Sequence, residues 1–132
     1  MNKIVVQQDD SQNTALTQDP RFIEAIRLFN EEKWYLAHDV FEELWHETSN
    51  PERKTLQGLL QVAVGQYHLS CGNRRGATIL FGEGLGRLRN IGSTDLGLDI
   101  AHLKCCVEAR LNRLQQDLDP DECTVPILLG KD

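Results

Sequence analysis

A histidine and a glutamate one helical turn apart, His38 and Glu42, are the residues of this chain best suited to chemistry. Side chains four positions apart on a helix lie on one face and can point to a shared spot. Both would border the apolar stripe formed by Trp34, Phe41 and Trp45. A carboxylate beside an imidazole fixes the tautomer of the ring, or joins it in holding a divalent cation. Zinc, manganese and iron suit these two ligand types.

A second polar line is expected on the following helix, where Gln61 and His68 flank an apolar stripe. If the two helices pack antiparallel, these side chains can face the first pair across the seam. The predicted metal ligands are His38, Glu42 and His68. The predicted pocket residues are Trp34, Trp45 and Gln61. His46 is left out, because eight helical residues place it about 12 Å along the axis from His38.

Three explanations of the His38 and Glu42 pattern are open, and a structural one comes first. A buried unpaired donor costs about 1 to 3 kcal/mol, so a His–Glu pair at the edge of a core is often only hydrogen-bonded within the fold. Binding of a metal or small ligand comes second. Catalysis comes third, with metal-assisted hydrolysis as the least demanding reaction, because a cation lowers the pKa of bound water to about 7. Whether the protein is an enzyme stays open.

Composition limits the classes of function. The 132 residues suffice for one domain, and 40% hydrophobic with 26% charged residues is typical of a folded protein. No apolar run approaches the roughly 20 residues of a membrane span, so no membrane association is expected. The net charge of −6 opposes binding to nucleic acid. The start of the chain has no secretory signal pattern, and the four cysteines have no CxxC spacing, so we predict a cytoplasmic protein with reduced thiols.

Hydrophobic periodicity predicts helices and no strand, and therefore an all-α compact bundle of about five helices built from antiparallel hairpins. Capping and proline signals place these helices near residues 19–30, 33–47, 52–70, 74–90 and 93–119, the last one capped by Ser93 or Thr94 and ending before Pro120. Gly58 and Gly65 should let a neighbouring helix approach closely. The expected organisation is a flexible arm at 1–18, a helical bundle at 19–119 and an extended tail at 120–132.

Several short motifs follow one another between residues 22 and 90. The first is His, three residues, Glu, two residues, then Trp or Tyr, and it is met by His38, Glu42 and Trp45. A Gln-Gly-Leu piece at 57–59 and a Gly-Asn-x-x-Gly-Ala piece at 72–77 come next. Together they resemble domain of unknown function family 309 of bacteria and archaea. The resemblance implies a small helical bundle and a role of the His/Glu motif in metal binding, but no reaction.

Two hypotheses of different classes result. In the first, the His38 and Glu42 pair and the facing His68 or Gln61 form a pocket for a divalent metal or a small ligand. In the second, the protein is an interaction module similar to tetratricopeptide hairpins, its grooves bind a protein partner, and the His/Glu pair only supports the fold. Self-association as a homo-oligomer stays open.

Overall fold

The structure is a computed structural model that describes residues 15–131. Its named helices are α2 (Pro20–Asn30), α3 (Trp34–Glu47), α4 (Glu52–Ser70), α5 (Arg74–Arg87) and α6 (Ile100–Gln115), followed by the 3-10 turn η1 (Pro120–Glu122). No strand occurs between residues 15 and 131. The prediction of an all-α helical bundle is therefore confirmed.

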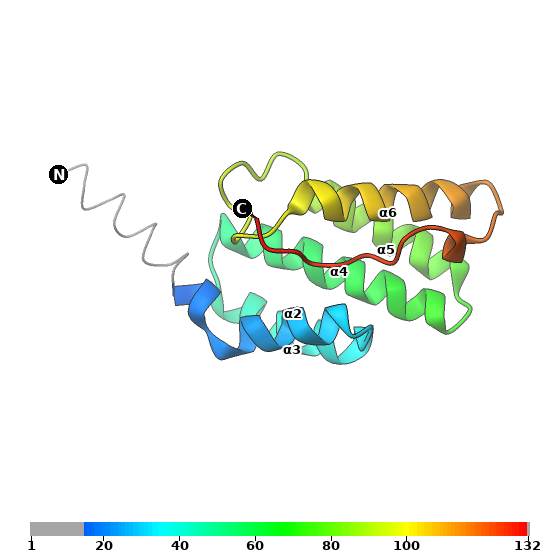
Figure 1. Cartoon of the computed structure of the whole chain (residues 1–132). Helices are drawn as coiled ribbons and strands as arrows, with labels where there is room; N and C mark the ends of the chain where they lie inside the picture. The colour runs from blue at the N-terminus through cyan, green and yellow to red at the C-terminus, as the bar shows by residue number, and fades with distance from the viewer. Residues whose placement is uncertain (1–14, 132) are drawn as a thin grey trace.

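The helices form two antiparallel hairpins, α2 with α3 and α4 with α5, and α6 packs on α5 (Figure 1). Because α4 contacts both α3 and α5, it lies at the centre of the bundle. The C-terminal segment after η1 returns along the bundle and ends near the start of α6 (Figure 1). On its way it meets the end of α2, where the Asn30 amide donates to the Leu128 carbonyl at 2.9 Å and accepts from the Leu128 N–H at 2.8 Å.

Helix starts follow the capping signals of the sequence. The Asp19 carboxylate accepts from the Arg21 N–H at 2.9 Å, and the Asn73 side chain accepts from the Gly76 N–H at 2.9 Å. These bonds satisfy donors that the first turn of a helix leaves without partners. Before Asn73, Gly72 has a φ of +78°, a conformation that glycine adopts without strain and that ends α4.

The close helix approach predicted at Gly58 and Gly65 is confirmed. A Cβ atom at Gly58 would lie 2.7 Å from the Leu88 side chain, and one at Gly65 would lie 2.6 Å from the Phe81 ring. Both distances are far inside the van der Waals contact of two carbons. The absence of a side chain on this face of α4 therefore lets α5 pack at short range.

The predicted start of the last helix is wrong. We expected a cap at Ser93 or Thr94, but α6 begins at Ile100, and its N-cap is Asp99, whose carboxylate accepts from the His102 N–H at 3.0 Å. Leu96, assigned from its spacing to the apolar stripe of this helix, has a φ of +58°, which a right-handed helix does not allow. It is buried as part of the connection between α5 and α6.

The predicted end of this helix is also wrong, because it lies several residues beyond the observed end. α6 ends at Gln115, and Asp117 has a φ of +57°, so the backbone leaves the helix before Leu118. The Leu118 N–H bonds to the Arg113 carbonyl at 2.8 Å, which closes the terminus. Leu118 is exposed, so the final member of the predicted stripe does not pack in the core.

Most of the arm expected at residues 1–18 lies outside the described residues. Its last residues, 15–18, are helical, and Leu16 packs in the hydrophobic core. Among residues 15–131, no helix combines the length and the apolar character that crossing a membrane requires.

Candidate functional site

His38 and Glu42 meet on α3, as their spacing predicts. The His38 Nε2 atom lies 3.0 Å from a Glu42 carboxylate oxygen, and the His38 side chain is 18% exposed. The other ring nitrogen, Nδ1, lies 3.3 Å from an Asp39 oxygen without forming a hydrogen bond to any described residue. The imidazole therefore sits at the edge of the core, with one nitrogen paired with Glu42 and the other close to Asp39 without a hydrogen bond.

A second imidazole approaches the same carboxylate, and the sequence reasoning missed it. The His46 Nε2 atom lies 3.9 Å from the second oxygen of Glu42. His46 was left out because it is too far from His38 to share an ion, and that distance argument did not consider a carboxylate placed between the two rings. The signal was present in the sequence, since Glu42 and His46 are also four residues apart.

His68 has a different neighbour. Its Nδ1 lies 3.2 Å from the side-chain nitrogen of Asn73. Two tyrosine rings connect it with His38: Tyr35 is 5.6 Å from the His38 ring and 5.1 Å from Tyr67, which is 6.2 Å from the His68 ring. Within residues 15–131, no group of three or more His, Cys, Asp or Glu side chains is placed to hold a metal ion. The structure thus joins His38 to Glu42 and places His68 beside Asn73.

Gln61 faces α5 and not α3. Its Nε2 donates to a Glu83 oxygen at 3.1 Å, and its side-chain oxygen is buried without a hydrogen bond among the described residues. Because α4 lies between α3 and α5, a polar side chain at the edge of its apolar face can contact either neighbouring helix. Gln61 therefore lies away from the His38 and Glu42 pair.

The two tryptophans occupy different environments. Trp34 is buried, and its ring packs edge-on against Phe29 with centroids 4.9 Å apart. Trp45 is half-buried, and the Arg53 guanidinium lies 4.0 Å from its ring centroid, a cation–π contact that connects α3 with α4. Core packing accounts for Trp34, and helix contact accounts for Trp45.

A hollow of about 460 Å³ lies where α3 begins and α4 ends, and we call it the α3/α4 hollow. It is lined by Glu32, Lys33, Trp34, Tyr35, Leu36, Tyr67 and Ser70. Three of its large side chains are open to solvent: Tyr35 and Leu36 are each 53% exposed and Tyr67 is 37% exposed. Contiguous exposed apolar surface of this kind often marks an interaction site. The sequence reasoning included Trp34 in a pocket but missed Tyr35, Leu36 and Tyr67.

The rim of the α3/α4 hollow carries one carboxylate that no described residue neutralises. Lys33 pairs with Glu31 at 3.2 Å, whereas the Glu32 carboxylate has no ion pair or hydrogen bond within the described residues. Glu32 has a φ of +62° at the turn between α2 and α3, which directs the chain into α3. On the other side, the hydrogen bond with Cys71 raises the pKa of the Tyr67 hydroxyl.

Comparison with known proteins gives a match to one family over part of the chain and no activity. A family model described as "Domain of unknown function (DUF309)" matches residues 22–80. No curated protein matches the chain. The matched residues span α2, α3, α4 and the first half of α5, and they include His38, Glu42 and the apolar side chains of the α3/α4 hollow. Residues 22–80 of the chain are therefore similar to the DUF309 family.

Proposed function

We propose that this protein is a cytoplasmic interaction module, whose α3/α4 hollow binds a basic segment of a partner protein that carries an apolar side chain. The observation that supports this proposal is the convergence of Tyr35, Leu36 and Tyr67 on one open hollow while all three remain exposed. A partner side chain seated there would remove this apolar surface from water, which contributes about 25 cal/mol per Å² buried.

Charge supports the choice of a basic partner. Glu32 at the rim is a carboxylate without a described partner, and the chain has a net charge of −6. A cationic group beside the apolar anchor would pair with Glu32, and the overall negative potential would speed the encounter. The four cysteines form no disulfide, which supports a reducing compartment such as the cytoplasm.

In this proposal the His38 and Glu42 pair has a positioning role. The bond to Glu42 fixes the imidazole, which packs 5.6 Å from the Tyr35 ring, and Tyr35 in turn packs on Tyr67 of α4. The pair therefore holds one wall of the α3/α4 hollow. The proposal assigns no reaction to the protein.

Leu36→Gln should weaken binding without disturbing the fold, because Leu36 is exposed. The probe is a display library of short random peptides, selected on the full chain. We expect the selected peptides to combine Lys or Arg with a large apolar residue, and Leu36→Gln to bind them about tenfold more weakly. Ile23→Gln is the matched control, because Ile23 is 59% exposed on α2 and does not line the hollow. Selection of acidic peptides, or equal loss in both variants, would overturn the proposal.

A divalent cation at the His38 and Glu42 pair is a second candidate function, favoured by the approach of the His38 and His46 rings to the two oxygens of Glu42. Glu42 would have to exchange its bond to His38 for the cation, and water would complete the coordination. This hypothesis predicts saturable zinc or manganese binding by untagged protein, measured by calorimetry and lost in His38→Ala. His102→Ala, on α6, is the control. Absence of saturable binding, or equal loss in both variants, would remove this candidate.

A further inference from the structure

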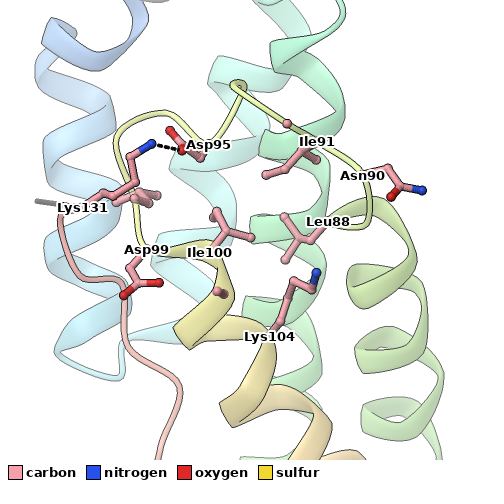
Figure 2. A pocket seen from close by; sticks show the side chains of 11 residues that line it. Leu88, Asn90, Ile91, Asp95, Asp99, Ile100, Lys104 and Lys131 are labelled. Carbon is pink, nitrogen blue, oxygen red and sulfur yellow. Dashed lines mark hydrogen bonds and ion pairs between the residues drawn. The ribbon is translucent and has the colours of Figure 1, made fainter.

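A second hollow, of about 300 Å³, lies between the end of α5, the connection to α6, the first turns of α6 and the C-terminal segment (Figure 2). We call it the α5/α6 hollow. It lies at the other end of α4 from the α3/α4 hollow, because the connection that forms it is bonded to Thr55 near the start of α4, whereas Tyr67 is near the end of that helix. The two hollows share no lining residue.

One wall of the α5/α6 hollow is apolar. Leu88 at the end of α5, Ile91 in the connection and Ile100 at the start of α6 converge there (Figure 2). Leu88 and Ile100 are buried in the core, so their positions are fixed by packing. Ile91 is less buried, so the apolar part of a ligand would gain mainly by covering Ile91.

Of the two lysines that line the hollow, one has no ion pair among the described residues. Lys131 pairs with Asp95, and the Asp99 carboxylate caps α6 through the His102 N–H. Burial opposes the ionisation of Asp95, but the bonds from Lys131 and a backbone N–H outweigh it and hold the pKa of this carboxyl below its usual value. Lys104 lines the hollow, and its ammonium group has no hydrogen bond or ion pair with any residue between 15 and 131. Its ammonium group lies beside Leu88 in Figure 2.

The connection that forms the hollow is held in place before any ligand binds. The Thr55 hydroxyl donates to the Thr94 carbonyl at 2.7 Å, which fastens the connection to α4. Two backbone bonds of 2.8 Å, from the Asp99 N–H to the Leu129 carbonyl and from the Lys131 N–H to the Gly97 carbonyl, fasten it to the C-terminal segment. A preorganised site loses little conformational entropy when a ligand binds.

From these observations we propose that the α5/α6 hollow binds a small monocarboxylate that bears an apolar group. The carboxylate would pair with the Lys104 ammonium, and the apolar group would pack on Ile91 and on the small areas of Leu88 and Ile100 that face the hollow. One lysine without an ion pair calls for a monoanion, and the volume is at the lower end of small-molecule sites. This site is independent of the proposed partner segment, since it uses other residues at another end of α4.

The test uses 4-phenylbutanoate as the probe, titrated into the full chain and followed by amide chemical shifts. We expect saturable shifts near Ile91, Ile100 and Lys104. The neutral amide of the same acid should bind about tenfold more weakly, because it lacks the negative charge. Acetate should not saturate the site, because it lacks the apolar group. Equal binding of acid and amide would overturn the proposal, as would shifts confined to Tyr35 and Leu36.

Two variants and one control make the test specific. Lys104→Met keeps much of the aliphatic chain of the lysine and should weaken binding about tenfold. Ala101→Phe places a bulky side chain in the hollow from an exposed position, so it should block binding while the fold is kept. Arg75→Gln removes a positive charge from an exposed site in the first turn of α5 and should leave binding unchanged. Loss in Arg75→Gln equal to that in Lys104→Met would show general charge attraction and would overturn the assignment.

Discussion

Replacement of Arg110 by methionine should lower the free energy of unfolding by about 3 kcal/mol. Arg110 lies on α6 and is only 1% exposed. Its guanidinium donates to the Gln66 side-chain oxygen at 3.2 Å, to the Cys123 carbonyl at 3.1 Å and to the Thr124 carbonyl at 3.2 Å. One side chain therefore joins α6, α4 and the C-terminal segment. Methionine fills much of the volume but leaves these acceptors without a donor.

Urea unfolding of the full chain measures this effect, and Arg75→Met is the matched control. Arg75 is exposed at the start of α5, so the same substitution there should change the unfolding free energy by less than about 0.5 kcal/mol. Asp121 lies 3.4 Å from Arg110 but is largely exposed, so this ion pair contributes little. A loss below about 1 kcal/mol in Arg110→Met would show that water replaces the lost donors at no great cost.

The second large effect is expected at Gly65, where alanine should lower the free energy of unfolding by about 2 kcal/mol. The added Cβ would lie 2.6 Å from the buried ring of Phe81, which is rigid and cannot turn aside. Alanine gains about 1 kcal/mol over glycine in helix propensity, and this gain only partly offsets the steric cost. α4 and α5 would have to separate slightly.

Gly82→Ala is the matched control and should have the opposite sign. Nothing lies within 4 Å of a Cβ at Gly82, on the outer face of α5, so only the propensity gain of about 1 kcal/mol remains. Thermal unfolding of both variants is the measurement. If both substitutions stabilised the protein, this would contradict the close packing of α4 against α5 at Gly65.

Local signals predicted most of the fold. The Asp19-Pro20 and Asn73 caps gave the starts of α2 and α5, because a side chain near a helix terminus bonds to the backbone of its own turn. The start of α6 could not be predicted in this way. Leu96 matches the spacing of the helical stripe, but it is buried by contacts of the connection with the rest of the bundle. Apolar spacing does not distinguish a buried loop leucine from a helical one.

Of the candidate site, only the contact between residues close together in the sequence was predicted. His38 and Glu42 lie on one helix, so their spacing determines their contact. The position of His68 depends on the register between α3 and α4, which packing of Tyr35 on Tyr67 helps to set. No periodicity in either segment specifies that register. The buried Arg110 was missed for a similar reason, because its acceptors lie on other segments of the chain.

The pair of hydrogen bonds between Asn30 and Leu128 has a consequence for synthesis of the protein on the ribosome. These two residues are 98 positions apart, so the end of α2 emerges long before its backbone partner. During most of translation the Asn30 amide must bond to water. We expect the first hairpin to form early during translation, and hydrogen exchange near Asn30 to slow only after the segment around Leu128 has left the exit tunnel.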